Sequence, residues 1–353
     1  MPSPPIKPNL SAIPSEPVLR LEGLEKVFRS GRRSVKAVTD FNLEIARGEV
    51  VGLVGESGSG KSTVARLAAQ LHRPSAGTIR LNGMALAARP NSRALLAYRR
   101  KVQMIFQDPF SSLNPTHTVG YALSRPLEIH GLARGRETAP AVRSLLERVG
   151  LSPGALYEQK FPHELSGGQR QRVGIARALA VQPELILADE PTSMLDVSIR
   201  LDIMNLMLDL RDQEGLSYLF ITHDLAGARY MSDRVAVMYA GHLVEIGPSA
   251  GLIGSPAHPY TQLLKSAAPK PESGLEATRV DARGEIPDLT QLPPGCPFEP
   301  RCPHARAECR AELPRMVELS NQSAHQVRCV LYYPELGAPG IAEIPASTQK
   351  ASA

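Results

Sequence analysis

The segment from Gly55 to Ser62 is the part of the sequence best suited to binding phosphate. It fits the pattern G-x-x-x-x-G-K-[ST] in full, after an apolar run at Val50–Val54 and before a helical pattern. Its glycines let backbone N–H groups converge on phosphate oxygens, and a helix N-terminus adds positive potential. We expect Lys61 to contact the β and γ phosphates of a nucleotide, and the Ser62 hydroxyl to ligate Mg²⁺. The predicted nucleotide-binding residues here are Gly55, Glu56, Ser57, Gly58, Ser59, Gly60, Lys61, Ser62 and Thr63.

Two carboxylates follow a second apolar run. Leu185 to Ala188 is apolar throughout and is followed by Asp189 and Glu190, so a buried strand would deliver both acids to the sheet edge that carries the phosphate loop. We expect Asp189 to hold the Mg²⁺ sphere and Glu190 to polarise an attacking water. An Asp-Glu pair at the end of a strand is common in proteins and by itself predicts little. Its position downstream of the phosphate loop favours the metal-binding and catalytic roles.

A second anion cradle lies between these two motifs. Ser166, Gly167 and Gly168 precede a predicted helix over 169–180, and small residues at a helix N-terminus again favour an anion. One bound triphosphate has little use for two cradles more than a hundred residues apart. The economical interpretation is that the second cradle serves the nucleotide of another subunit.

The surrounding pattern predicts an α/β protein built around these loops. Val18 to Glu49 alternates as an antiparallel sheet would, and 118–164 is largely helical. Further predicted elements are a strand at 102–106, a helix at 197–211, a strand at 219–222 and a strand-rich stretch at 234–247. We therefore expect a P-loop core with an antiparallel β subdomain, a helical subdomain and a small irregular C-terminal module.

Length and composition exclude several classes. The chain has 353 residues, of which 42% are hydrophobic and 21% charged, as in a soluble globular protein. Its apolar runs are of strand length, far below the roughly 18 to 20 residues that a membrane span needs. The net charge is +5 without a run of five basic residues, so we expect no nucleic-acid partner. Met1 to Pro17 is proline-rich without an apolar core, which predicts a disordered arm rather than a secretory signal.

The segment from Leu165 to Gln169 reads LSGGQ and lies between the P-loop and Asp189-Glu190. In this order the motifs resemble those of ATP-binding cassette (ABC) ATPases, the motor subunits of transporters. The resemblance implies two cassettes that close head to tail around two ATP molecules, so that Leu165, Ser166, Gly167, Gly168 and Gln169 contact the ATP of the partner.

The same resemblance implies roles for four further residues. Gln107 matches the Q-loop, which touches Mg²⁺ and couples the site to the membrane partner, and His223 matches the switch histidine at the γ-phosphate. Asp196 matches the D-loop at the dimer interface, although Met194 stands where the family often has Ala. Phe28 is a candidate to stack on adenine, and a core aromatic is nearly as good an interpretation.

Two other stretches resemble the peptide and nickel uptake branch of the family. They are QDPFSSLNP at 107–115 and HPYT at 258–261, the latter followed by Leu263-Leu264 and Ala267-Ala268-Pro269. With them the resemblance to oligopeptide and dipeptide permease ATPases runs from Val18 to Cys329. Neither stretch carries chemistry that residue types alone explain.

The four cysteines have the spacing C-x5-C-x6-C-x19-C, at Cys296, Cys302, Cys309 and Cys329. Without an export signal they are poor candidates for disulfides. Four thiolates could ligate zinc or an iron–sulfur cluster, and both are favoured over unrelated free thiols. The resemblance favours a [4Fe-4S] cluster, and neither His304 nor His325 is then needed as a ligand.

Together these observations predict the ATP-hydrolysing subunit of a binding-protein-dependent importer of di- or oligopeptides. The expected division is an arm at 1–17, a nucleotide-binding domain at 18–250 with a helical subdomain at about 118–180, a C-terminal domain at 251–335 and a disordered tail at 336–353. The predicted catalytic residues are Glu190, His223 and Lys61. The predicted ligands of Mg²⁺ are Ser62, Gln107 and Asp189.

The expected partners are a second cassette, either a copy or a paralogue, two membrane permease subunits and an extracytoplasmic solute-binding protein. This places the chain at the cytoplasmic face of the inner membrane as a peripheral subunit. The alternatives are import of nickel or another small solute, and a soluble cassette ATPase that acts on nucleic acid or ribosomes.

Overall fold

The computed structural model describes residues 16–31, 33–108, 112–267, 287–319 and 324–336. Most of the predicted N-terminal arm and C-terminal tail, and the residues 109–111 and 268–269 of the branch-specific stretches, lie outside these ranges. No helix in the described ranges is long and apolar enough to cross a membrane.

The first sheet is antiparallel and four-stranded, in the order β2-β1-β4-β5. Its strands are β1 (Leu19–Ser30), β2 (Arg33–Ile45), β4 (Ala76–Leu81) and β5 (Met84–Ala85). Apolar residues of its inner face, such as Leu21, Phe41 and Ile79, are buried in one core with Val64 and Leu67 of the first helix. The sheet therefore packs across α1 and fixes the start of that helix against the second sheet.

The second sheet is mixed and runs in the order β11-β12-β10-β9-β3-β8-β7-β6. The strands β9, β3, β8, β7 and β6 are parallel to one another, whereas β10 is antiparallel to β9. The parallel strands bring their carboxyl ends to one edge. The bounds are β3 (Val50–Val54), β6 (Val102–Ile105), β7 (Leu185–Asp189), β8 (Ser217–Thr222), β9 (Arg234–Tyr239), β10 (His242–Pro248), β11 (Val317–Glu318) and β12 (Gln326–Val327).

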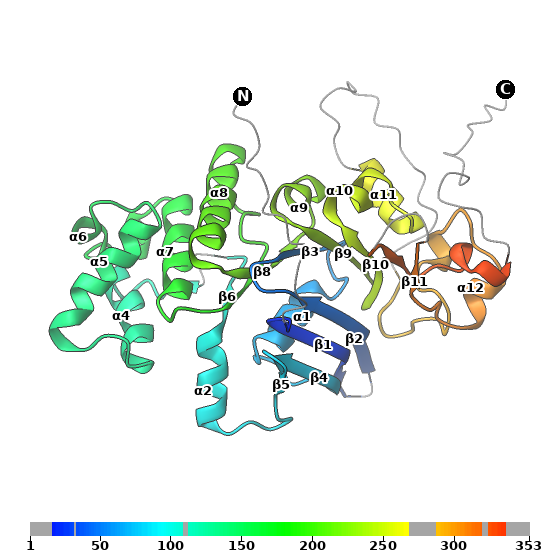
Figure 1. Ribbon diagram of the computed structural model, residues 1–353, viewed down its shortest axis with the longest axis horizontal. Helices are drawn as coiled ribbons and strands as arrows, with labels where there is room; N and C mark the ends of the chain where they lie inside the picture. The colour runs from blue at the N-terminus through cyan, green and yellow to red at the C-terminus, as the bar shows by residue number, and fades with distance from the viewer. Residues whose placement is uncertain (1–15, 32, 109–111, 268–286, 320–323, 337–353) are drawn as a thin grey trace.

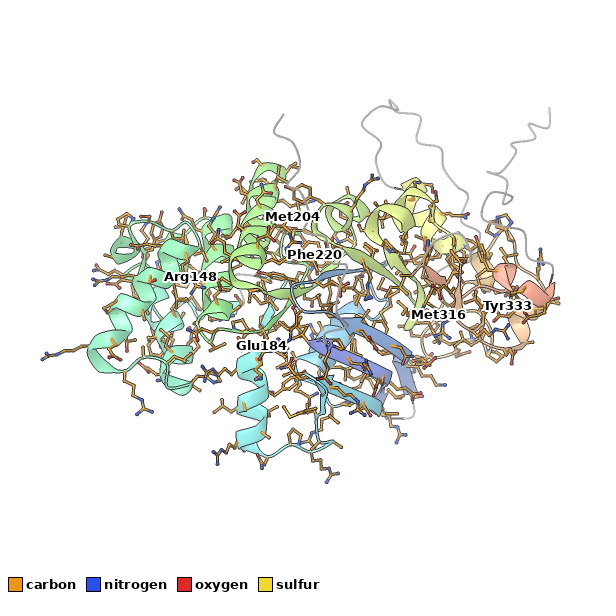
Figure 2. All side chains as sticks on the ribbon, in the orientation of Figure 1. Arg148, Glu184, Met204, Phe220, Met316 and Tyr333 are labelled. Atoms are coloured by element: carbon orange, nitrogen blue, oxygen red, sulfur yellow. The ribbon has the colours of Figure 1, made fainter. Side chains whose placement is uncertain are left out.

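Helices lie on both sides of this sheet, and α4 to α7 gather at the end opposite the C-terminal residues (Figure 1). Met204 of α8 and Phe220 of β8 lie in the core that joins α8 to the sheet (Figure 2). The α-helices are α1 (Lys61–Ala68), α2 (Ser92–Lys101), α4 (Val119–Ile129), α5 (Thr138–Arg148), α6 (Gly154–Tyr157), α7 (Gly167–Leu179), α8 (Val197–Glu214), α9 (Leu225–Met231), α10 (Ser249–Gly254), α11 (Pro259–Ala267) and α12 (Glu308–Ala311). Short 3-10 turns are η1 (Gly135–Glu137), η2 (Pro162–Glu164), η3 (Glu299–Arg301), η4 (Val330–Tyr332) and η5 (Pro334–Leu336).

The residues after β10 pack onto the second sheet through a buried carboxylate. Both side chains of the pair Glu245 and His325 are fully buried, with His325 Nε2 2.7 Å from Glu245 Oε1. Glu245 also accepts hydrogen bonds from the backbone N–H groups of Ala257 and His258, at 2.7 and 3.0 Å. A buried charge needs such partners, and here they attach the turn before α11 to β10.

Candidate active site

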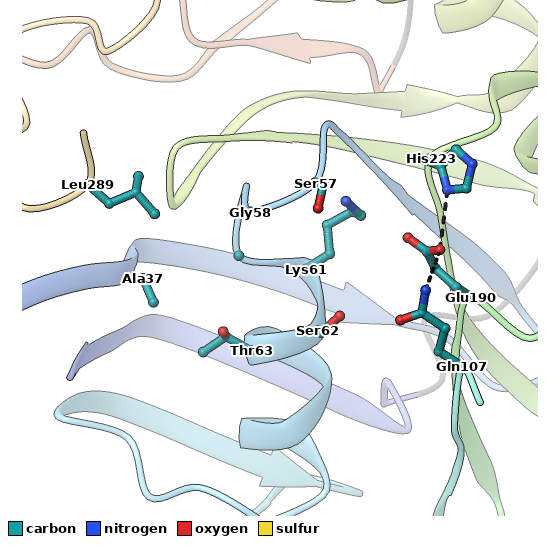
Figure 3. A pocket seen from close by; sticks show the side chains of 11 residues that line it. Ala37, Ser57, Gly58, Lys61, Ser62, Thr63, Gln107, Glu190, His223 and Leu289 are labelled. Atoms are coloured by element: carbon teal, nitrogen blue, oxygen red, sulfur yellow. Dashed lines mark hydrogen bonds and ion pairs between the residues drawn. The ribbon is translucent and has the colours of Figure 1, made fainter. Parts of the chain in front are cut away.

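A cavity of about 660 Å³ lies at the carboxyl edge of the parallel strands (Figure 3). The loops after β3, β6, β7 and β8 all contribute to it, as the expected convergence of parallel strand ends requires. The structure brings nine of the predicted site residues to its wall: Ser57, Gly58, Gly60, Lys61, Ser62, Thr63, Gln107, Glu190 and His223.

The P-loop wraps around the start of α1. Gly60 has a φ of 106°, and a Cβ at this position would meet the carbonyl oxygen of Ala37 at 2.4 Å, so only glycine fits. Lys61 Nζ donates to the carbonyl oxygens of Gly55 and Glu56, at 2.7 and 2.8 Å. Burial lowers the pKa of Lys61, and the carboxylates of Glu190, Asp189 and Glu56 oppose that shift.

Ser62 and Asp189 form the oxygen pair expected for a magnesium ion. Ser62 Oγ donates to Asp189 Oδ1 at 2.8 Å, from the first turn of α1 to the end of β7. Burial raises the pKa of Asp189, while the bond from Ser62 and the charge of Arg66 oppose the shift. A hydroxyl and a carboxylate side by side fit Mg²⁺, which takes oxygen ligands and keeps several waters.

Three side chains meet at the far end of the cavity (Figure 3). Gln107 Nε2 donates to Glu190 Oε2 at 3.1 Å, and His223 Nδ1 lies 3.3 Å from the same oxygen. Glu190 has a φ of 46°, an unfavourable left-handed conformation for this residue type. A hydrogen bond from the Glu190 N–H to the carbonyl oxygen of Ile221, at 3.0 Å, holds the residue in this conformation.

The opposite end of the cavity is apolar and was not predicted. Ala37 and Leu289 line it, on the other side of the P-loop from Glu190 and His223 (Figure 3). Leu289 follows Asp288, whose carboxylate accepts from the N–H and the hydroxyl of Thr290. Leu289 belongs to no motif, so the sequence offered no signal for it.

Phe28 does not line the cavity, and its ring instead packs edge-on against His72 at 5.4 Å.

Three P-loop residues lie outside the cavity wall: Gly55, Glu56 and Ser59. Of these, Glu56 is bonded to the C-terminal residues, because its N–H donates to Tyr260 Oη at 2.8 Å and its carboxylate pairs with Arg301. Within the HPY motif, His258 Nδ1 accepts from the Tyr260 N–H at 3.1 Å. The HPY motif thus places a tyrosine hydroxyl on the P-loop, which residue types alone had not revealed.

The LSGGQ segment does not line the cavity of its own chain. Ser166 caps α7, since its Oγ accepts from the Gln169 N–H and Gln169 Oε1 accepts from the Ser166 N–H. Leu165 is buried, and a Cβ at Gly168 would meet Ile199 at 2.7 Å. Asp196 is the N-cap of α8, between the exposed apolar side chains of Met194 and Val197.

The predicted metal site at the cysteines is wrong. Within the described ranges no group of three or more His, Cys, Asp or Glu side chains is placed to hold a metal ion. Burial raises the pKa of Cys296 and Cys329 to about 12 and that of Cys302 to about 11, so these thiols are protonated at neutral pH in the metal-free chain. Cys296 and Cys302 pack against an apolar cluster with Phe298. The four cysteines do line one small cavity, but neither the [4Fe-4S] cluster nor zinc is supported. Cys296, Cys302 and Cys329 pack within apolar clusters as small hydrophobic side chains.

Two protein-family models match the chain. The model described as ABC transporter matches residues 38–193, which include the P-loop, Gln107, LSGGQ and Glu190. The model described as oligopeptide/dipeptide transporter, C-terminal region, matches residues 244–309, which include Tyr260 and Arg301.

Curated relatives match nearly the whole chain. The putative oligopeptide transport ATP-binding protein YkfD of Bacillus subtilis is 44% identical over 320 residues, covering 90% of this chain and 96% of the relative. The oligopeptide transport ATP-binding protein AppF of the same species is 42% identical over 332 residues, covering 92% and 100%. A putative peptide import ATP-binding protein of Brucella ovis is 44% identical over 314 residues, covering 89% and 98%.

Solved structures match the core. The dimeric ATP-binding cassette MJ0796 bound to ADP and Pi is 31% identical with a TM-score of 0.59, over 65% of this chain and 98% of that chain. CbiO1 from Clostridium perfringens, part of the transporter complex cbiONQ, is 27% identical with a TM-score of 0.60, over 68% and 91%. With the two sheets and the helices described above, this likeness confirms the predicted α/β fold class of the core.

Proposed function

Because this chain belongs to the ABC transporter family of ATP-binding proteins, we propose that it is the ATP-hydrolysing subunit of a peptide importer. The observation that carries the proposal is one cavity lined by Lys61 of the P-loop, by Glu190 and by Ser62, whose hydroxyl donates to Asp189 just behind the cavity wall. These are the groups that phosphoryl transfer to water needs: a phosphate cradle, a metal-binding pair and a carboxylate for the nucleophile.

Hydrolysis follows from this arrangement. The P-loop N–H groups and Lys61 would bind the β and γ phosphates, and Ser62 with Asp189 and Gln107 would hold Mg²⁺, which would neutralise phosphate charge. Glu190 polarises a water whose oxygen bonds to the γ phosphorus as the bond from that phosphorus to the β–γ bridging oxygen breaks. One proton of the water passes to the Glu190 carboxylate, and the other stays on the released phosphate. Gln107 and His223, both within 3.3 Å of Glu190 Oε2, orient that carboxylate, and His223 contacts the γ phosphate.

We assign the nucleobase to the apolar end of the cavity. Ala37 and Leu289 lie there, across the P-loop from Glu190, so a triphosphate with its γ phosphate at Glu190 extends its base toward them. Phe28 packs edge-on against His72 but is 39% exposed, and its stacking on adenine stays a prediction beside this assignment.

A second cassette completes the site in this proposal. LSGGQ is preorganised at the N-terminus of α7 but stands outside its own chain's cavity. Met194 and Val197, which flank the predicted D-loop residue Asp196, are 56% and 82% exposed, as expected for side chains that a partner covers. One of the structural neighbours is itself a dimer bound to ADP and Pi.

Two observations support membrane partners in this proposal: the names of the relatives, and a groove in which a permease subunit could dock. Relatives at 42–44% identity are named for oligopeptide transport or peptide import. A groove beside Gln107 is lined by the exposed apolar side chains of Leu71 and Phe106 and by Arg99 and Arg177. We propose that a permease subunit docks there, at the cytoplasmic face of the membrane, with two permeases and a solute-binding protein in the complex.

Uptake in cells tests the proposal. Cells that lack this chain and are restored with the wild type should take up labelled di- or oligopeptides, whereas cells restored with Lys61→Ala should not. Restored uptake of nickel without any restored peptide uptake would refute the peptide assignment and retain the importer. Peptide uptake that Lys61→Ala supports as well as the wild type would refute the motor assignment.

A further inference from the structure

Glu56 is bonded at three points by groups from different parts of the chain. Its carbonyl oxygen accepts from Lys61 Nζ at 2.8 Å, and its N–H donates to Tyr260 Oη at 2.8 Å. Its carboxylate accepts two bonds from Arg301, at 2.9 and 3.1 Å. Two of these three bonding partners, Tyr260 and Arg301, come from the residues after β10. Glu56 itself lies in the P-loop, beside Ser57, which lines the cavity.

The guanidinium of Arg301 is held through its two terminal nitrogens, while its buried Nε has no hydrogen-bond partner. Its side chain is only 9% exposed, it donates to Tyr239 Oη at 3.2 Å, and it lies over the rings of Tyr239 and Phe298. Its two-pronged bond to Glu56 raises the pKa of Arg301 above the ordinary value, as the largest contribution. A planar guanidinium on a carboxylate fixes direction as well as distance, so the carboxylate of Glu56 has one position.

Tyr260 fixes the backbone of the same residue. It is fully buried, and its ring packs on Tyr239 and Phe298 with centroids 4.5 and 5.5 Å apart. Its hydroxyl accepts the Glu56 N–H, so this peptide plane cannot rotate without losing a buried bond. Because the carbonyl oxygens of Gly55 and Glu56 both accept from Lys61 Nζ, the orientation of Glu56 helps to place the Lys61 ammonium.

We propose that Arg301 and Tyr260 are positioning residues of the nucleotide site, which hold Glu56 and thereby set the affinity of the P-loop for ATP. The inference rests on the proposed function in one respect, namely that the P-loop binds ATP. The residues after β10 then stabilise the conformation of the P-loop from the side away from the phosphates, without contacting phosphate themselves.

The test measures the Kd of the full-length chain for a fluorescent ATP analogue with Mg²⁺, together with KM and kcat for ATP. Arg301→Met should raise Kd and KM about tenfold, a typical coupling between linked sites, with a much smaller change in kcat. The double variant Glu56→Gln/Arg301→Met should be no weaker than Arg301→Met alone, because both changes break one interaction. Tyr260→Phe, which keeps the ring and loses the hydroxyl, should raise Kd by a smaller factor.

Arg310→Met is the matched control. Arg310 also belongs to the C-terminal residues and also pairs with a carboxylate, Glu299 at 2.8 Å, but its side chain is 75% exposed and does not touch the P-loop. We expect its Kd and KM to equal those of the wild type. A tenfold rise in this control as well would mean that any lost ion pair of the C-terminal residues disturbs the site, and would overturn the specific role of Arg301.

Other outcomes separate the inference from the proposed function. A Kd for Arg301→Met within twofold of the wild type, with Lys61→Ala binding lost, overturns the inference alone. Unchanged binding by Lys61→Ala overturns the proposed function. If Arg301→Met does not fold, as judged by its thermal midpoint, Arg301→Lys and Tyr260→Phe decide, since each keeps the fold-stabilising bulk and removes one bond to Glu56; wild-type Kd in both overturns the inference.

Discussion

Oε2 of Glu190 lies 3.3 Å from Nδ1 of His223. The two residues directly follow β7 and β8, which are parallel neighbours in the sheet. Their contact is therefore a product of topology, since adjacent parallel strands end side by side. Gln107, which follows β6 and donates to the same oxygen, extends the arrangement by one more strand. The carboxylate is oriented from two sides before any nucleophile is activated.

Replacing that carboxylate should separate binding from hydrolysis. We expect Glu190→Gln to lower the ATP hydrolysis rate by at least about 100-fold, because general-base catalysis contributes on that order, while the Kd for ATP changes little. The chain should then elute as a dimer in size-exclusion chromatography with ATP and Mg²⁺. Glu214→Gln is the control, since Glu214 pairs with Arg148 on the surface. Hydrolysis by Glu190→Gln at the wild-type rate would remove Glu190 from the mechanism.

The apolar end of the cavity should discriminate ATP from triphosphate. Leu289→Ala should weaken ATP binding by about 1 kcal/mol, roughly fivefold in Kd, because apolar surface against the base is lost. The affinity for inorganic triphosphate, which has no base, should stay the same. Leu292→Ala provides the control, because Leu292 packs in the same cluster but does not line the cavity. An equal loss for ATP and triphosphate would show that Leu289 acts on the P-loop and not on the base.

Acid should destabilise the fold through a buried histidine. Burial lowers the pKa of His258 to about 3, whereas a histidine of the unfolded chain titrates near 6.5. Below about pH 6.5 the unfolded state takes up a proton that the folded state does not, so stability is complete above 6.5 and falls as the pH drops toward 3. Between pH 7 and pH 5 this histidine alone should lower the free energy of unfolding by about 2 kcal/mol.

Urea denaturation of His258→Asn at both pH values checks this effect. The asparagine can still accept the Tyr260 N–H, and the difference between pH 7 and pH 5 should shrink by the same amount. His163→Asn, at an exposed site, should leave the pH dependence as it is. A wild-type pH dependence in His258→Asn would show that the burial of His258 does not govern acid sensitivity.

The buried thiols should resist alkylation in the folded chain. Iodoacetamide reacts with the thiolate, and burial raises the pKa of Cys302 to about 11 and that of Cys296 and Cys329 to about 12. At pH 8 we expect these three residues to react far more slowly than free cysteine, and all four cysteines of the chain to react rapidly in urea. Mass spectrometry of the labelled peptides measures both. Fast labelling of the folded chain would contradict the raised pKa values.

The parts of the fold that the sequence predicts are those where chemistry fixes the spacing. The strand at Val50–Val54 has the predicted bounds, and a helix does begin at Lys61 within the predicted phosphate loop, because such a loop needs both. Helix α2 was missed, since Tyr98 is its only buried residue and no apolar period arises. It is stabilised by its ends: Asn91 caps its first turn, and its last turn is basic.

In the candidate site, too, some contacts can be predicted from the sequence and others cannot. Lys61, Asp189 and Glu190 come together because their motifs follow β3 and β7, two parallel strands on either side of β8 that end at the same sheet edge. A sequence pattern can express this. The contact between Glu56 and Arg301 spans 245 residues, and no local spacing predicts it. Spacing misled at the cysteines, because it does not say whether the thiols face polar groups or, like Cys296 and Cys302, an apolar cluster.

The bonds from Tyr260 and Arg301 to Glu56 also bear on how such chains can be recombined. A chimaera that joins this cassette to another tail keeps every phosphate-binding residue, yet it leaves a carboxylate and an amide of the P-loop without partners unless the new tail brings an arginine and a tyrosine to the same places. The cassette and the tail therefore share one buried interaction, and a chimaera keeps it only if Glu56 and the arginine 245 residues away are exchanged together.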